Sequence, residues 1–416
     1  MDCSDGSSRK RAENGDTWIM LCRAGFEDAL AEEIARAAPA HELHIATQPG
    51  WLRVDSPAPR GSFLAATPYV FERQRLPRAE WCAELDTAQW AALLATRWNA
   101  ALARDARPWT LHAFAPNPGA EDSLTRAAHR LGAALRQALG TAQAGLAGRY
   151  VEPEQAVCVL RQELGGVLCD SRPRRDRVAG ASRQGLGGAP RTLPAGLHVL
   201  QVCRVPGGAW TSLAPGAEIS DPWPGGVHRV PDDALAPSRS FAKIEEAFDV
   251  MGSAPTAGET AVDLGAAPGG WSWAFVKRGC RVMAVDNGPV KLKSLGGWGG
   301  ELQHIRHDGM TFTPPRPVDW LASDMLVAPG AALGLVRKWH LAGWTRRMIV
   351  NFKLPQRHPL AAVEPMRAAL DALPGFRYRL RQLFHDRREV TLMAECERTP
   401  PVARRPRRHL SRMKRR

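Results

Sequence analysis

A glycine-rich segment between two apolar runs constrains this sequence more than any other feature. Residues 261–271 read Ala-Val-Asp-Leu-Gly-Ala-Ala-Pro-Gly-Gly-Trp, so that apolar positions lead into an acidic residue and then into a tight turn. A helix-like segment at 272–278 follows at once, and a second apolar run, 281–285, ends on Asp286. This order of strand, turn, helix and strand is typical of the opening of a nucleotide-binding α/β unit. The glycines let the backbone approach a ligand that a side chain would exclude.

The charge of the chain is strongly positive and unevenly distributed. Its 416 residues carry a formal net charge of +14, although the hydrophobic content of 44% and the charged content of 24% are ordinary for a globular protein. The tail, residues 401–416, holds eight Lys or Arg and no acid, so the rest of the chain is only mildly basic. A phosphate-rich partner would explain both features. The alternative is that the tail only keeps the chain soluble.

Cysteine usage and hydropathy indicate an ordinary cytosolic chain. The eight cysteines are scattered without a C-x-x-C pair, which argues against zinc and against a disulfide framework. The polar N-terminus has no apolar h-region of a secretory signal, and no apolar run is long enough to span a bilayer. We therefore expect a cytoplasmic protein with no bound metal and no membrane contact.

Two α+β stretches precede the glycine-rich segment. Residues 1–16 are polar and predicted to be disordered. Residues 17–85 predict an α+β subdomain in the order strand, helix, strand, strand, and residues 86–205 predict a second α+β domain. The elements expected within these stretches are strands at 18–22, 109–114, 156–160, 167–169 and 197–205, two strands within 41–54, and helices at 25–37, 86–103 and 121–139.

The remaining segments divide the chain further. The loop 171–191 carries six arginines among many glycines and one acid, and is either a flexible connector or an arm that orders on RNA. Dense glycine and proline predict a linker over 206–237. From 238 to 398 strands and helices alternate, beginning with a serine-capped helix at 238–251, which indicates a parallel sheet. The tail 399–416 is expected to be disordered.

The glycine-rich segment differs from the dinucleotide fingerprint G-x-G-x-x-G because Pro268 stands inside its turn. The run D-L-G-A-x-P-G-G-W is more restrictive, and it resembles the cofactor loop of the FtsJ-like RNA ribose 2′-O-methyltransferases. A departure is Ala267, where relatives often carry cysteine. Further segments resembling that family stand in order along the chain, at 238–240, 243–248, 285–289, 308–309, 323–325, 351–355 and 385–391.

The resemblance implies a fold, a cofactor and a substrate. The expected fold is α/β: a Rossmann-like S-adenosylmethionine-dependent methyltransferase domain at 238–398, preceded by an α+β RNA-binding region. That region has a ferredoxin-like part at 17–85 and a THUMP-like part at 86–205, and Gly25-Phe26-Glu27 looks like its start. The implied substrate is a cytidine of 23S ribosomal RNA near the peptidyl-transferase centre, in free RNA or in a precursor particle. We expect a monomer.

The resemblance also implies where S-adenosylmethionine binds. The glycine loop would approach the methionine part, Asp286 the ribose hydroxyls and Asp308 the adenine edge. Asp286 could instead cap a helix, and an Asp-Gly turn such as the one at Asp308 is common in any protein. The implied cofactor-binding residues are Ser240, Gly265, Ala267, Pro268, Gly269, Gly270, Asp286, Asp308 and Asp324.

The family carries a Lys-Asp-Lys-Glu set, which here falls on Lys243, Asp324, Lys353 and Glu389. Methyl transfer from a sulfonium to a hydroxyl is an in-line displacement that requires alignment and removal of a proton. Lysine is a poor base at its ordinary pKa of about 10.4, but desolvation and a second cation favour the neutral form. We predict Lys353 as the base, Asp324 as the residue that positions it, and Lys243 with Glu389 as orienting groups. Glu395 is an alternative to Glu389 on the same strand.

Three rival functions remain at this stage. A dehydrogenase could use a strand, glycine turn and acid, although Pro268 and the missing fingerprint count against it. A non-catalytic RNA-binding protein would leave the four catalytic candidates coincidental. Methylation of a protein or small molecule on the same fold is disfavoured by the two lysines, and the target could also be another RNA.

Overall fold

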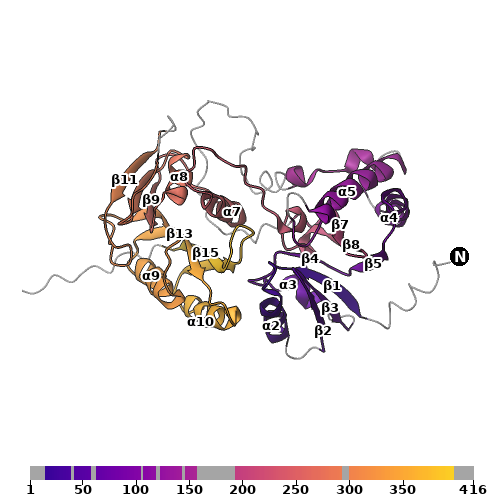
Figure 1. Ribbon diagram of the computed structural model, residues 1–416, viewed down its shortest axis with the longest axis horizontal. Helices are drawn as coiled ribbons and strands as arrows, with labels where there is room; N and C mark the ends of the chain where they lie inside the picture. The colour runs from indigo at the N-terminus through magenta and orange to yellow at the C-terminus, as the bar shows by residue number, and fades with distance from the viewer. Residues whose placement is uncertain are drawn as a thin grey trace, which may run out of the picture.

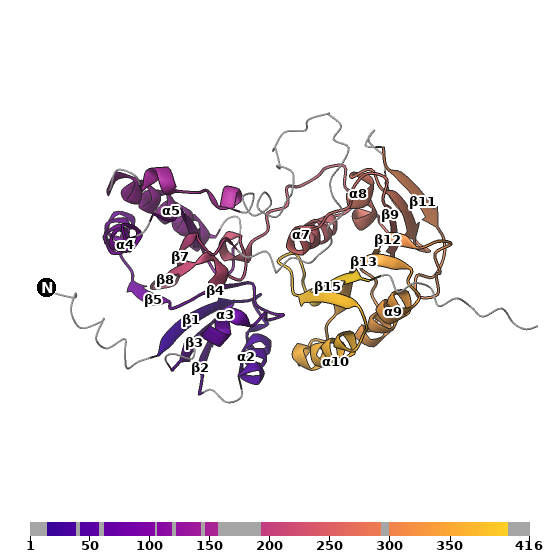
Figure 2. The ribbon, with the colours of Figure 1, turned by 180° about the vertical axis from the view of Figure 1, so that it is seen from behind.

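The computed structural model describes residues 15–38, 42–57, 62–104, 106–118, 122–142, 146–156, 193–292 and 299–397. Its elements form three sheets in two lobes: two four-stranded sheets in the N-terminal region and a seven-stranded sheet in the C-terminal α/β domain (Figure 1). Figure 2 shows the same two lobes from behind. The two tails, the arginine loop at 171–191, the predicted strand at 167–169 and most of that at 156–160 lie outside the described residues.

The first sheet matches the predicted order of strand, helix, strand, strand. It has the strand order β2-β3-β1-β4, and β3 pairs antiparallel with both β1 and β2. In β3 the side chains alternate, with Leu52 and Val54 buried and Arg53 exposed, because neighbouring residues of a strand face opposite sides. Its elements are β1 (Asp16–Leu21), α2 (Glu27–Ala37), β2 (His44–Gln48), β3 (Trp51–Ser56), α3 (Ser62–Ala66) and β4 (Gln74–Leu76).

The second sheet corrects two of the predicted boundaries. Its order is β5-β8-β7-β6, so β5 lies before the boundary predicted at residue 85, and β8 lies inside the predicted linker. Gly207, at a φ of 80°, turns the chain between β7 and β8, which explains the glycine there without a linker. Its elements are β5 (Glu80–Ala83), α4 (Thr87–Leu102), β6 (Trp109–Phe114), α5 (Ser123–Ala142), the short helix η1 (Ala147–Arg149), β7 (His198–Val205) and β8 (Gly208–Pro215), followed by η2 (Gly216–Glu218) and η3 (Pro224–Gly226).

The C-terminal domain has the expected α/β architecture. The strand order is β11-β10-β9-β12-β13-β15-β14, parallel except for β15, which runs antiparallel to both of its neighbours. From β9 the chain adds β10 and β11 toward one edge of the sheet, and from β12 it adds the later strands toward the other edge. The direction in which strands are added therefore reverses between β9 and β12. The elements are α7 (Phe241–Met251), β9 (Thr260–Leu264), α8 (Gly270–Val276), β10 (Arg281–Val285), β11 (Glu301–Ile305), β12 (Val318–Ser323), α9 (Pro329–Leu341), β13 (Thr345–Lys353), α10 (Pro359–Asp371), β14 (Phe376–Arg381) and β15 (Glu389–Cys396).

Helices cover both faces of this sheet, which explains its continuous apolar strands. Ala261 and Trp320 pack with α7 and α8 on one face, and Val262 and Leu321 pack with α9 and α10 on the other. Strands buried on both faces lack a polar alternation. The serine cap predicted for the helix at 238–251 is absent: the helix begins at Phe241, and the Ser240 hydroxyl lies 2.7 Å from that of Ser238 without capping the backbone.

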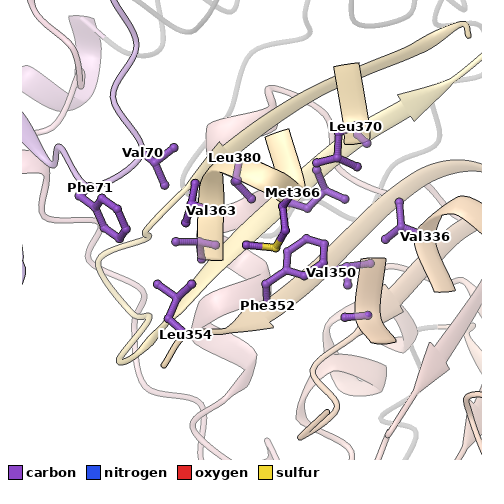
Figure 3. Packing of buried hydrophobic residues seen from close by; sticks show 14 of the residues in the cluster. Val70, Phe71, Val336, Val350, Phe352, Leu354, Val363, Met366, Leu370 and Leu380 are labelled. Carbon is purple, nitrogen blue, oxygen red and sulfur yellow. The ribbon is translucent and has the colours of Figure 1, made fainter. Parts of the chain in front are cut away.

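The N-terminal region and the C-terminal domain share a hydrophobic core. Val70 and Phe71 of the first lobe belong to the same cluster as Val363 on α10 and Leu380 on β14 (Figure 3). Next to them, the backbone N–H of Gln382 donates to the carbonyl of Val70 at 2.8 Å. Helices α2 and α10 lie side by side across this junction (Figures 1 and 2). The first sheet is therefore fixed against the far edge of the large sheet.

A buried histidine connects the chain segment before α7 to both lobes. His228 lies 3.1 Å from the carboxylate of Asp221 and 3.2 Å from that of Asp249, and Asp221 also pairs with Arg381 at 2.9 Å. Burial disfavours the imidazolium, but Asp221 and Asp249 outweigh it and raise the pKa of His228 to about 10. His228 is therefore protonated in the folded protein at neutral pH.

This shift predicts a pH dependence of stability. The unfolded pKa of histidine is about 6.5, so the stabilisation by His228 is complete below that pH and is lost as the pH rises toward about 10. The wild type should therefore have a larger free energy of unfolding than His228→Gln at low pH. We expect this difference between the two proteins to decrease as the pH rises from about 6.5 to about 10. Urea titrations at several pH values between 6 and 10 measure the difference, and a difference that does not change with pH would contradict the assignment.

Candidate active site

A cavity of about 1010 Å³ lies at the carboxyl ends of the parallel strands, around the point where the strand order reverses. Each of four neighbouring strands delivers a lining residue at or just after its end: Gly265 after β9, Asp286 after β10, Asp324 after β12 and Lys353 on β13. Because β15 is antiparallel, its first residue, Glu389, reaches the same edge. Open α/β sheets bind ligands at this position.

The glycine loop forms one wall of the cavity. Gly265 has a φ of 75°, and a Cβ there would lie 2.4 Å from the Met325 side chain. A Cβ on Gly270 would lie 2.4 Å from the hydroxyls of Ser238 and Ser240. The Ala267–Pro268 peptide bond is cis. The predicted residues Ser240, Gly265, Ala267, Pro268 and Gly270 all line the cavity.

Gly269 is the one predicted loop residue that does not line the cavity. It stands at a φ of 115°, directly before α8, where its carbonyl accepts from the N–H of Trp273 at 2.8 Å. This φ lies in a region that side-chain-bearing residues rarely adopt. Gly269 therefore shapes the turn, and its contact with the cofactor stays a prediction.

The two carboxylates predicted for the nucleoside line the cavity but also hold local structure. Asp286 accepts from the backbone N–H of Ala267 at 2.9 Å and from that of Gly288 at 2.6 Å, so it connects the glycine loop to the end of β10. Asp308 accepts from the N–H of Met310 at 2.9 Å in a tight turn. Each carboxylate oxygen has further acceptor capacity for a ligand hydroxyl or amine.

The four predicted catalytic residues meet in one closed set. Asp324 lies between the two lysines. Its Oδ1 accepts a hydrogen bond from Lys353 Nζ, and its Oδ2 lies 3.4 Å from Lys243 Nζ. Glu389 closes the set: its Oε1 is bonded to Lys243 Nζ and lies 4.0 Å from Lys353 Nζ. The β13–β15 pairing places Lys353 directly opposite Glu389. Two cations thus alternate with two anions at the cavity wall.

The charges in this set stabilise one another. Burial disfavours the Lys243 ammonium, but Asp324 and Glu389 outweigh it and raise the pKa of Lys243 above its ordinary value. Burial likewise opposes the charge of Glu389, yet Lys243 and Lys353 lower the pKa of Glu389 below its ordinary value. Lys243 therefore stays charged at neutral pH and is suited to act as a fixed cation rather than as a base.

Comparison with known proteins agrees with this geometry. Residues 236–330 match the FtsJ-like methyltransferase family. Over 400 residues the chain is 32% identical to ribosomal RNA large subunit methyltransferase M of Thauera aminoaromatica, an alignment that covers 91% of this chain and 95% of that protein. The chain belongs to the ribosomal RNA large subunit methyltransferase M family.

Other members of the methyltransferase M family show the same relationship. The protein of this name from Alkalilimnicola ehrlichii is 33% identical over 386 residues, or 91% of this chain and 94% of that protein. The one from Methylococcus capsulatus is 45% identical over a shorter alignment of 184 residues. Among solved structures, a possible methylase from Clostridium difficile covers 93% of this chain and 99% of its own at 10% identity and a TM-score of 0.30.

S-adenosylmethionine is the cofactor of this methyltransferase family, and the cavity has the chemistry to hold it. The cofactor carries a positive sulfonium and supplies the methyl group. Asp286, Asp308 and Asp324 place carboxylate acceptors on the cavity wall, and Lys243 and Lys353 lie beside Asp324. Among the residues that the structure describes, no helix is long and apolar enough to cross a membrane.

Two further residues of the site, Asp263 and Asn351, were not among the predicted site residues, although both stand in segments that the sequence analysis singled out. Asp263 is buried beneath the loop, accepts from the Ser272 hydroxyl at 2.7 Å, and has its pKa raised to about 7 by burial. Asn351 donates from Nδ2 to Asp324 Oδ1 at 3.0 Å. Both lie inside apolar strand runs, and a polar residue interrupting such a run is the signal that could have identified them.

Asn351 is held by a buried polar chain. The Thr391 hydroxyl lies 2.7 Å from Asn351 Oδ1 and 2.8 Å from Asp386 Oδ2. Burial raises the pKa of Asp386 well above its ordinary value. Thr391 donates to Asn351 Oδ1, which directs the Asn351 N–H toward Asp324. This chain fixes the orientation of the Asp324 carboxylate.

We therefore expect Asn351→Ala to lower kcat for methyl transfer roughly 10- to 150-fold, because a hydrogen bond to a charged group is lost. The equilibrium affinity for S-adenosylmethionine should change little, since Asn351 does not line the cavity. Single-turnover kinetics and calorimetric titration measure the two effects. Thr391→Ser keeps the hydroxyl and is the control that should retain activity, whereas unchanged turnover in Asn351→Ala would refute the positioning role.

Proposed function

We propose that this protein transfers the methyl group of S-adenosylmethionine to the ribose 2′-hydroxyl of a cytidine in large-subunit ribosomal RNA. The observation that carries the proposal is the closed set of Lys243, Asp324, Lys353 and Glu389 at the wall of the cavity that the glycine loop borders. A base and a fixed cation beside a methyl donor suit the activation of a weakly acidic hydroxyl. The relatives' name supplies the class of substrate, large-subunit ribosomal RNA.

In the proposed mechanism Lys353 accepts the 2′-hydroxyl proton as the oxygen attacks the methyl carbon. Asp324 holds the Lys353 amine in position, and its own orientation is set by Asn351. Lys243 remains an ammonium, paired with Glu389, and offers its remaining hydrogen-bonding capacity to the substrate. The step needs alignment of oxygen, methyl carbon and sulfur along one line, which the rigid strand ends favour.

We further propose that the N-terminal region binds RNA, with the two sheets acting as the ferredoxin-like and THUMP-like parts. The shared core at Val70 and Val363 holds the first sheet at a constant position relative to the catalytic domain. A fixed distance between RNA-binding surface and cavity would select one nucleotide within a folded RNA. We also propose that the protein acts as a monomer in the cytoplasm.

The test is a map of ribose methylation on large-subunit ribosomal RNA from cells with and without the gene. We expect one cytidine to carry a 2′-O-methyl group only when the protein is present. Loss of a ribose methyl from a different RNA would favour the alternative substrate. A cytidine methylation pattern that is identical in both strains would defeat the proposed target.

A further inference from the structure

A second cavity lies in the N-terminal region and shares no lining residue with the active-site cavity. Its volume is about 790 Å³, and residues of both N-terminal sheets line it. The aromatic part consists of Trp51 on β3, Trp81 on β5 and Trp210 on β8. The methyl-transfer chemistry uses none of these residues, so the cavity requires a separate explanation.

The three tryptophans form a continuous aromatic wall. Trp81 and Trp210 are paired across β5 and β8, with ring centroids 5.2 Å apart in an edge-on arrangement. Trp210 in turn lies 6.2 Å from Trp51. Trp210 is buried, whereas 46% of Trp81 is exposed, which makes Trp81 the only aromatic residue among the exposed large hydrophobic side chains that the structure describes.

Two glycines next to lining residues allow close contacts that build the cavity walls. A Cβ on Gly208 would lie 2.5 Å from Cζ2 of Trp81 and 2.4 Å from the carbonyl oxygen of Cys82, so glycine lets the Trp81 ring lie against β8. The side chain of Asn117 lies against Gly50 and donates to the carbonyl of Pro49 at 2.9 Å. The cavity is therefore preformed, with its aromatic surface held in place.

The chemistry of the lining favours a nucleobase over a phosphate group. Arg53 already pairs with Asp55 at 2.8 Å, and the Asp122 carboxylate in the lining would repel a phosphate. A flat exposed indole stacks on any base, and the amides of Gln48 and Asn117 can hydrogen-bond to a base edge. We propose that this cavity binds an unpaired nucleobase of the RNA substrate, stacked on Trp81; the proposal rests on the proposed function.

The test uses a transcript of large-subunit ribosomal RNA and the full-length protein. Trp81→Ala should weaken RNA binding roughly 5- to 150-fold and raise the KM for RNA, with kcat and cofactor affinity unchanged. The slope of log K against log salt should stay the same, because stacking releases no counterions. Trp81→Phe should retain most of the affinity. Leu93→Ala, at another exposed apolar side chain outside the cavity, should bind like the wild type.

Failure of this inference and failure of the proposed function give different results. If the wild type methylates RNA and Trp81→Ala binds it equally well, the nucleobase site is refuted while the enzymatic function stands. A shallower salt slope in Trp81→Ala would indicate a lost phosphate contact and would also refute stacking. If the wild type neither binds nor methylates the RNA, both proposals fall. Circular dichroism confirms that each variant is folded.

Discussion

Lys353→Ala should reduce methyl transfer by roughly 100- to 10,000-fold, the usual contribution of a general base. Equilibrium binding of S-adenosylmethionine should survive, because Lys353 contacts Asp324 and Glu389 while the glycine loop forms a separate part of the wall. Single-turnover transfer from labelled cofactor measures the first quantity and calorimetry the second. Loss of methyl transfer with retained cofactor binding would identify Lys353 as a residue that acts in the chemical step and not in cofactor binding.

The matched control is Lys338→Ala, which removes a lysine of α9 that does not line the cavity. It should leave transfer and cofactor binding unchanged. If Lys353→Ala lost cofactor affinity as steeply as it lost transfer, Lys353 would be a binding residue and the assignment of the base would be wrong. Lys243→Ala cannot replace this test, because it leaves Glu389 without its closest cation.

Gly269→Ala should weaken S-adenosylmethionine binding roughly 5- to 150-fold. A residue with a Cβ at a φ of 115° carries strain of about 1–3 kcal/mol, and every 1.4 kcal/mol is tenfold in affinity. The added Cβ would also lie 3.0 Å from Val290 Cγ1. In the cofactor-free Gly269→Ala variant we expect the loop to move and so relieve this strain. Binding of the cofactor must then restore the wild-type turn, and the energy that this requires lowers the affinity. Calorimetric titration gives the affinity.

Gly258→Ala provides the control for backbone strain alone. Gly258 has a φ of 86°, no atom lies within 4 Å of the position its Cβ would take, and it does not line the cavity. Its substitution should lower the free energy of unfolding while leaving cofactor affinity at the wild-type value. Equal affinities in Gly269→Ala and the wild type would show that the turn does not depend on this glycine.

Local sequence patterns predicted the elements of the active site well. The glycine loop and the strand at 281–285 are where apolar runs and turn residues indicated them. The meeting of Lys353 with Glu389 follows from an antiparallel register between β13 and β15. Periodicity within one strand does not identify which strand will be its neighbour in the sheet, so only the family resemblance could bring these two residues together.

Other features could not be predicted correctly from local sequence patterns. Glycine and proline density indicated a linker where the structure has the β7–β8 hairpin, because a turn and a linker use the same residues. The ionisation of Lys243 and the chain from Asp386 to Asn351 depend on burial and on contacts between distant segments. The three-tryptophan cavity arises where two sheets meet, and neither sheet alone would show it.

The central claim is that a ribose oxygen receives the methyl group. The direct measurement incubates the purified protein with large-subunit ribosomal RNA and methyl-labelled S-adenosylmethionine, digests the RNA to nucleosides and separates the products by chromatography. The account predicts label in 2′-O-methylcytidine, at a level that Lys353→Ala nearly abolishes. Label in a base-methylated nucleoside, or unchanged 2′-O-methylcytidine with Lys353→Ala, would contradict it.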